Sequence, residues 1–196
     1  MLKSKFTIAI IAAALLGTGL LNSSFTGNTS AKRTAKPVAK TSKATKPAEE
    51  GKIEWISIEE AQKRSKKEPR KIVVDVYTSW CGWCKRMDKA TFGDPKVAAM
   101  INKDFYAVKF NAESPDNVIF KDEVFHYNPS AKANELAVKW LKGQMGYPSI
   151  VYLDEKLNTI SVRAGYEGPE MYPKVLEYFQ TKAYKKKTYD EFASGK

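Results

Sequence analysis

The apolar and polar positions of this chain predict a series of strands and helices between about residues 53 and 179. Two near-continuous apolar runs, Ile72–Tyr77 and Phe105–Asn111, are typical of strands that are covered on both faces. Two further strands are expected at Tyr147–Leu153 and Thr159–Arg163, which a turn separates. The pattern indicates an α/β fold with a mixed sheet flanked by helices.

Capping residues mark where helices begin. Ser57 and Glu60 form a capping-box pattern, which predicts a helix through about Ser65. Asp94 as N-cap and Pro95 at the first helical position predict another helix to about residue 102. Three more helices are expected, at Lys85–Ala90, at Asn134–Leu141 and from Pro169 onward. The residues of the last helix that we expect to face the core are Met171, Val175, Leu176 and Phe179.

An insertion is predicted at about residues 114–145. Its short apolar runs, Val118–Phe120 and Val124–Tyr127, resemble the two strands of a hairpin. The insertion forms either a substrate-facing rim or a cap packed on the sheet. His126 is interpreted as an ordinary hairpin residue, because a lone histidine has no neighbouring nucleophile to activate.

The N-terminal segment, residues 1–31, has the pattern of a signal peptide. Lys3 and Lys5 precede the apolar run Phe6–Leu21, and the small residues of Thr29–Ala31 offer a cleavage site. The run is shorter than the roughly 20 residues that a membrane-spanning helix needs. We therefore expect an exported protein, periplasmic or secreted, with an uncleaved membrane anchor as the alternative.

Positive charge is concentrated before the predicted domain, which we place at 52–180. Residues 1–52 carry nine Lys/Arg and two Glu, a balance of +7 out of the formal +11 of the whole chain. Residues 32–51 are rich in Lys, Pro, Ala and Thr without apolar periodicity, which predicts a disordered linker. This distribution does not support nucleic-acid binding. The linker is either a solvated spacer or a segment with weak attraction to an anionic membrane surface. The basic C-terminal tail, residues 181–196, is predicted to be a solvated extension.

The chain has only two cysteines, Cys81 and Cys84, and they directly follow the first buried strand. The order of strand, turn and helix puts Cys81 at a helix N-terminus, whose free N–H groups and positive dipole end lower a thiol pKa. A thiolate at Cys81 can attack a substrate disulfide, and Cys84 can then resolve the mixed disulfide. A zinc site lacks enough ligands, and a disulfide that closes so short a loop adds little stability. Redox chemistry is the leading hypothesis, and no metal is predicted.

Asp75 interrupts the first apolar strand. Burial of a carboxylate is costly unless it is paired or neutral, and desolvation raises its pKa. We interpret Asp75 as proton acceptor and donor for Cys84; the alternative is an Asp that reaches an edge or a backbone donor. Lys109, within the second buried strand, is either its partner or a surface lysine.

The segment VDVYTSWCGWCK resembles the active-site segment of thioredoxins, and more closely that of secreted thioredoxin-like disulfide reductases. Asp75 lies six positions before Cys81, as the buried Asp of that family does, and Lys109 in VKFNAE matches its buried Lys. Tyr147-Pro148 in GYPSIVYLD matches the cis-proline, and Gly165 matches the glycine after the last strand. These markers follow in order across roughly residues 53–179. The resemblance implies a thioredoxin fold with an insertion before the cis-proline strand.

The resemblance also implies roles for the residues. Cys81 would attack, Cys84 would resolve, and Asp75 with Lys109 would manage protons. The residues that would contact the substrate are Trp80, Gly82, Trp83, Tyr147 and Pro148. No organic cofactor or metal is expected, because the dithiol is the redox centre. The expected partners are protein or peptide disulfides and, for a reductase, an upstream electron donor.

The direction of the reaction stays open at this point. Trp83 stands where thioredoxins usually carry proline, which leaves the redox potential undetermined. We favour a reductase, because Cys-Gly-x-Cys is typical of that group, but an oxidase or isomerase would use the same residues. A non-catalytic adaptor or holdase with the same fold is the alternative from another functional class.

Overall fold

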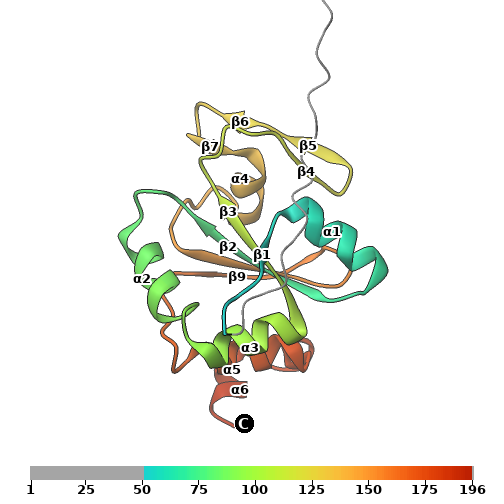
Figure 1. The fold of residues 1–196 in the computed structure, drawn as a ribbon, viewed down its shortest axis with the longest axis vertical. Coiled ribbons are helices and arrows are strands. Elements are labelled where there is room, and N and C mark those ends of the chain that lie inside the picture. Colours follow the sequence, from blue (N-terminus) through green and yellow to red (C-terminus); the bar gives the residue numbers. More distant parts are fainter. Residues whose placement is uncertain (1–50, 196) are drawn as a thin grey trace, which may run out of the picture. The chain divides into compact units, whose positions relative to one another are not determined.

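A five-stranded mixed sheet forms the centre of the part of the chain that the structure, a computed structural model, describes: residues 51–195 (Figure 1). The sheet order is β1-β3-β2-β8-β9. Its strands are β1 (Trp55–Ile56), β2 (Lys71–Tyr77), β3 (Phe105–Asn111), β8 (Ser149–Leu153) and β9 (Thr159–Ala164). Strands β1, β3 and β2 pair in parallel, whereas β8 is antiparallel to both β2 and β9. The two long apolar runs, which were predicted to be buried strands, are therefore two inner strands of the sheet that pair in parallel.

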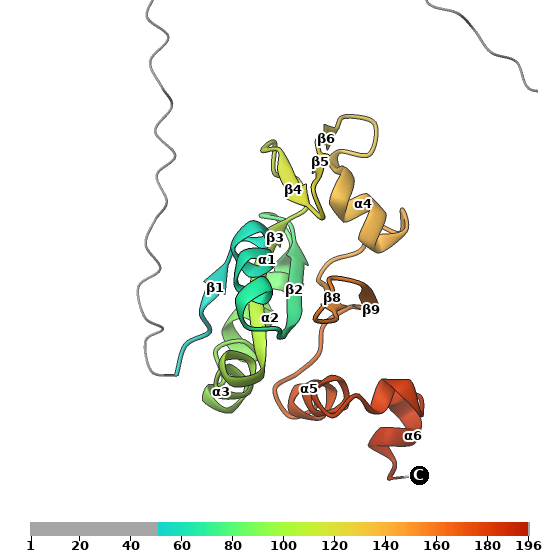
Figure 2. The same cartoon turned by 90° about the vertical axis from the view of Figure 1, so that its right-hand side faces the viewer.

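Helices cover both faces of this sheet, because the side chains of β2 alternate between two apolar clusters. Ile72, Val74 and Val76 pack with α1 (Ile58–Lys67) and α4 (Glu135–Leu141). Val73 packs on the opposite face with α2 (Gly82–Ala90), α3 (Pro95–Asp104) and α5 (Tyr172–Gln180). Figure 2 shows α3 and α5 on one side of the sheet and α4 beyond its other side. A strand buried on both faces thus explains why the sequence of β2 is apolar at nearly every position.

The register of the sheet brings two distant segments together. Val76, near the carboxyl end of β2, pairs with Ser149, the first residue of the antiparallel β8. The chain that leaves β2 toward Cys81 therefore starts beside the chain that enters β8 from Pro148. On the other side of β2, Asp75 pairs in register with Lys109 of β3. The sheet alone thus places three segments of the predicted site at one end of the strands.

Helices α1 and α3 start at the predicted caps. Ser57 Oγ accepts a hydrogen bond from the Glu60 N–H at 3.1 Å, and Asp94 Oδ1 accepts one from the Val97 N–H at 3.0 Å. Each cap satisfies an N–H group that has no partner within its own helix. Both helices run two residues beyond the predicted ends.

The cap of α3 gives a first prediction. Substituting Asp94→Ala is expected to lower the free energy of unfolding by about 1 kcal/mol, because the Val97 N–H loses its acceptor and the helix its terminal charge. Urea unfolding of the oxidised domain measures this loss. Asp94→Asn keeps an acceptor oxygen and should restore most of it; equal losses for both variants would contradict the capping argument.

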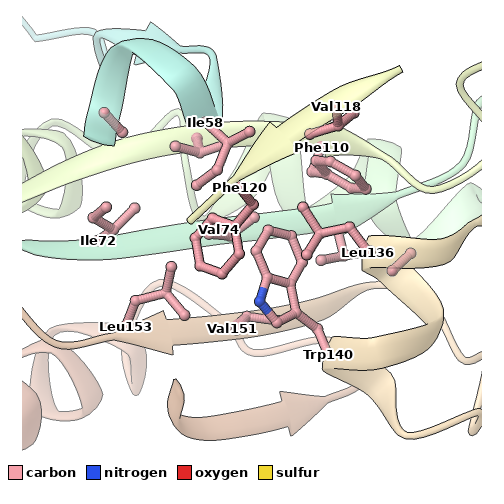
Figure 3. Packing of buried hydrophobic residues seen from close by; sticks show 14 of the residues in the cluster. Ile58, Ile72, Val74, Phe110, Val118, Phe120, Leu136, Trp140, Val151 and Leu153 are labelled. Carbon is pink, nitrogen blue, oxygen red and sulfur yellow. The ribbon is translucent and has the colours of Figure 1, made fainter. Parts of the chain in front are cut away.

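The insertion contains the predicted hairpin, β4 (Val118–Phe120) paired antiparallel with β5 (Glu123–Phe125). A second short ladder, β6 (Tyr127–Asn128) with β7 (Ala133–Asn134), was not predicted, because two-residue strands carry no periodic signal. Figure 3 shows Trp140 of α4 next to Phe110 and Phe120; the ring centroids are 5.2 and 5.4 Å apart. The insertion is therefore a cap that completes the core on this face of the sheet.

The hairpin is also joined to α1 by side chains. Gln62 donates to the Ile119 carbonyl at 2.8 Å and accepts from the Lys121 N–H at 2.8 Å. Glu59 accepts from the Ile119 N–H at 3.1 Å. Polar side chains of one helix thus satisfy backbone groups of β4, and of the turn after it, that β5 does not use.

Two expectations about the C-terminal part were wrong. Helix α5 begins at Tyr172 rather than near Pro169, and Met171 is 59% exposed instead of facing the core. Tail residues also do more than extend into solvent. A short 3-10 helix, η1 (Ala183–Lys185), and α6 (Tyr189–Ala193) pack on the core, with the Phe192 and Tyr178 ring centroids 5.3 Å apart. The many lysines of the tail make its sequence polar on average, so its aromatic residues were not predicted to pack on the core.

The predicted signal peptide and the linker up to residue 50 lie outside the described residues. In the range that is described, no helix has the length and apolar character needed to cross a membrane.

Candidate active site

The two cysteines are at the start of α2, where the strand–turn–helix order of the sequence predicts them. Cys81 is the N-cap of α2 and its Sγ accepts a hydrogen bond from the Cys84 N–H at 3.0 Å. A disulfide joins Cys81 to Cys84, and the two residues are 4% and 2% exposed. The first turn of α2 has no acidic residue to oppose a thiolate. On reduction, the N–H groups and the helix dipole therefore favour the thiolate form of Cys81.

Asp75 lies on the face of β2 that points toward α2. It is 1% exposed, and its Oδ2 accepts a hydrogen bond from Lys109 Nζ at 2.6 Å. Its other oxygen, Oδ1, is buried and has no hydrogen-bond partner among the described residues. The structure thus pairs the two strand residues and leaves one carboxylate oxygen available as a proton acceptor.

Burial dominates the electrostatics of Asp75. Desolvation raises the pKa of Asp75, and the Lys109 ammonium lowers it by less. With a smaller increase from the charge of Asp88, the pKa is about 6. Burial by itself would lower the pKa of Lys109, but its ion pairs with Asp75 and Asp88 outweigh this, and its pKa is raised. A carboxyl with a pKa near neutrality can both take up and release a proton near neutral pH.

Asp88 is a site residue that sequence reasoning missed. Its carboxylate on α2 accepts a hydrogen bond from the same Lys109 ammonium that binds Asp75. Asp88 follows Cys84 by four positions, a spacing that puts both on one face of a helix and could have indicated it. The Lys109 ammonium also lies over the rings of Trp55, Tyr77 and Phe92, at 5.2, 4.7 and 5.7 Å from their centroids. Carboxylates and aromatic faces together fix the position of this cation.

The peptide bond between Tyr147 and Pro148 is cis, as the resemblance implied. The Pro148 carbonyl accepts a hydrogen bond from the Gly165 N–H at 2.8 Å, which joins the segment before β8 to the one after β9. Gly165 has a φ of +96°, which side-chain-bearing residues rarely adopt. The glycine noted in the sequence is thus required where the two segments meet.

Aromatic residues next to the cysteines are exposed. Trp80 is 65% and Trp83 is 56% exposed, although most large apolar side chains of the domain are buried. Trp80 packs edge to face with Tyr147, at 6.0 Å between centroids. Gly82, between Cys81 and Trp83, is also exposed, and a Cβ there would meet no atom within 4 Å. All five predicted substrate-contact residues therefore lie on two segments, the one after β2 and the one before β8, which the sheet register brings together.

Three further residues at this surface were not predicted. The Trp80 Nε1–H is 3.0 Å from both carboxylate oxygens of Glu113. Tyr166 packs against Trp83 with 5.5 Å between centroids, and the Arg86 guanidinium lies over the Trp83 ring at 5.3 Å. The contacts of Glu113 and Tyr166 join segments that are far apart in sequence and leave no local signal, whereas the i,i+3 spacing of Trp83 and Arg86 on α2 could have indicated theirs.

A family model described as "Thioredox_DsbH: Protein of unknown function, DUF255" matches residues 36–183. No curated protein matches the chain. Among solved structures, a thioredoxin from Thermus thermophilus is 18% identical, with 65% of this chain and 86% of that chain covered and a TM-score of 0.50. A structure entitled "DsbH Oxidoreductase" is 18% identical (72% and 94% covered, TM-score 0.48). A putative disulphide-isomerase from Bacteroides thetaiotaomicron is 24% identical (72% and 99% covered, TM-score 0.47). The likeness to the Thermus thermophilus thioredoxin, with the observed sheet and helices, confirms the predicted thioredoxin fold.

Proposed function

Because the chain belongs to the thioredoxin-like Thioredox_DsbH family and carries a Cys-X-X-Cys pair, we propose that it is an exported thiol–disulfide oxidoreductase. We further propose that it reduces disulfides of proteins or peptides. The observation that supports this most is the Cys81–Cys84 pair at the N-terminus of α2, on the side of β2 where Asp75 is buried. Export rests on the N-terminal pattern of residues 1–31, outside the described range.

The proposed reaction begins with the reduced dithiol. The Cys81 thiolate attacks one sulfur of the substrate disulfide, a new S–S bond forms, and the substrate S–S bond breaks. The first substrate sulfur leaves as a thiolate and takes a proton from solvent. The cis-Pro148 segment and the exposed Trp80 border the place where the substrate chain would lie.

Resolution then uses Cys84. Its thiol gives its proton to the Asp75 carboxylate, and the Cys84 sulfur attacks Sγ of Cys81. The second substrate thiolate leaves, and the protein is left with the Cys81–Cys84 disulfide. Two electrons have passed from the dithiol to the substrate, so an upstream dithiol donor must reduce the protein again. The dithiol is the redox centre, and the proposed cycle needs no bound cofactor.

The redox equilibrium of the Cys81–Cys84 couple tests the proposed direction. We expect a strongly reducing value when the full chain is equilibrated with glutathione buffers and the fraction of disulfide is measured by thiol alkylation and mass spectrometry. If the Cys81–Cys84 disulfide persists only in strongly oxidising buffer, the result would contradict the proposed reductase function and favour an oxidase function. Reduction of a model disulfide under the same conditions serves as the activity control.

A binding function is the second candidate, supported by one observation. Ile119 and Val124 pair across the β4–β5 hairpin and are both exposed, which is a small apolar surface on the insertion. An adaptor or holdase could use it. The buried Asp75, linked through Lys109 to Asp88 on the helix that carries the Cys-X-X-Cys pair, favours the redox function instead, because an adaptor needs neither group.

A further inference from the structure

Each exposed tryptophan next to the cysteines contacts one charged side chain. The charge is negative at Trp80 and positive at Trp83. Trp80 immediately precedes Cys81 and donates to the Glu113 carboxylate at 3.0 Å. The carboxylate also influences Tyr147, whose pKa is raised by burial and further by Glu113. We name Trp80, Tyr147 and Glu113 the acidic wall.

The other tryptophan belongs to a basic arrangement. Trp83 packs against Tyr166, and the Arg86 guanidinium lies 5.3 Å from the Trp83 centroid and 5.6 Å from the Tyr166 centroid. Arg86 is exposed, and it forms no ion pair with another of the described residues. Its positive charge is therefore available to a ligand. We name Trp83, Tyr166 and Arg86 the basic wall.

Both walls adjoin the same backbone link. Tyr147 comes directly before Pro148, Tyr166 directly after Gly165, and the Gly165 N–H donates to the Pro148 carbonyl at 2.8 Å. In the segment WCGWC, residues 80–84, Trp80 neighbours Cys81 and Trp83 neighbours Cys84. A substrate segment that reaches Cys81 beside cis-Pro148 thus meets an aromatic surface with a carboxylate at one place and a guanidinium at another.

On the premise of the proposed function, we propose that this surface selects cysteine-containing segments with a basic side chain on one side of the cysteine and an acidic one on the other. The basic side chain would contact Trp80 and pair with Glu113, since aromatic faces and carboxylates both attract cations. The acidic side chain would pair with Arg86. Complementary charge at the edge of an apolar contact fixes which way a partner lies.

The test uses the reduced full chain and synthetic peptides with one cysteine in a mixed disulfide to a chromogenic thiol. One peptide has Lys before and Glu after the cysteine, a second has the reverse order, and a third has Gln at both positions. We expect one charged order to react about tenfold faster than the reverse in low salt, with the neutral peptide between them. The difference should shrink in high salt, because screening weakens exposed charges.

Charge reversal provides the matched variants. Combining Glu113→Lys with Arg86→Glu should invert the preferred order, whereas Lys89→Glu on α2 and Glu123→Lys on the insertion should leave it unchanged. Equal rates for the two orders in the native chain, or the same preference in the double variant, would overturn the inference while the redox function stands. Failure of all three peptides, the neutral one included, would instead contradict the proposed function itself.

Discussion

Substituting Cys81→Ser is expected to abolish disulfide reduction, with a loss of at least about a thousandfold. The hydroxyl that replaces the thiol is not ionised near neutral pH, and Cys84 lies one turn into α2 rather than at the N-cap position from which Cys81 is proposed to attack. Turnover of a model disulfide with a thiol donor measures the loss. Retention of a tenth or more of the activity would show that Cys81 is not the nucleophile.

The Cys84→Ser variant is the matched control, because it should keep the attack and lose the resolution. The mixed disulfide between Cys81 and the substrate is then expected to accumulate and to be visible by mass spectrometry. A variant of Cys84 that turns over normally would contradict the proposed order of the two cysteines.

Substituting Asp75→Asn is expected to stabilise the oxidised domain at neutral pH and to slow catalysis. The pKa of Asp75 is raised from the ordinary 3.8 to about 6, so the native state holds the proton more tightly than the unfolded state does. The stability that the protonated Asp75 contributes to the folded state is therefore complete below pH 4 and is lost as the pH rises through 6. At about 1.4 kcal/mol per pKa unit, the buried charge costs roughly 3 kcal/mol at pH 7, and Asn removes most of this cost.

Urea unfolding at several pH values checks this prediction. The variant should gain about 2 to 3 kcal/mol over the native chain near pH 7.5, and the gain should vanish below about pH 4. Asp122→Asn, at an exposed position of the β4–β5 turn, should show no such gain. In the activity assay, Asp75→Asn should accumulate mixed disulfide, because the Cys84 proton loses its acceptor. A destabilised variant with normal turnover would contradict both the electrostatics and the proposed role of Asp75.

Sequence reasoning succeeded where the signal is local or periodic. Continuous apolar runs located β2 and β3, and Asp94-Pro95 located the start of α3. Helix α5 was misplaced, because Pro169 lies in the turn before the helix and Pro173 is the proline in its first turn. The Tyr172 N–H bonds to the Gly168 carbonyl within that turn, which leaves Met171 outside the core.

The sequence predicted those site residues that lie on one continuous segment or that pair in register on neighbouring strands. Cys81 and Cys84 are adjacent to β2, and Lys109 pairs with Asp75 across two strands whose apolar pattern was evident. Glu113 lies 33 residues from Trp80, and no periodicity relates these two positions. Its contact with Trp80 depends on how the chain turns after β3, which the amino-acid pattern does not specify.

The hydrogen bonds from α1 to β4 have a consequence for the exposed edge of the insertion hairpin. An exposed strand edge can recruit an extended segment of another chain, which is a route to aggregation. Gln62 and Glu59 already bind the Ile119 and Lys121 backbone groups at the outer edge of β4. Helix α1 therefore shields the hairpin from adding a foreign strand at this edge, while the aromatic rings around Cys81 stay open to solvent.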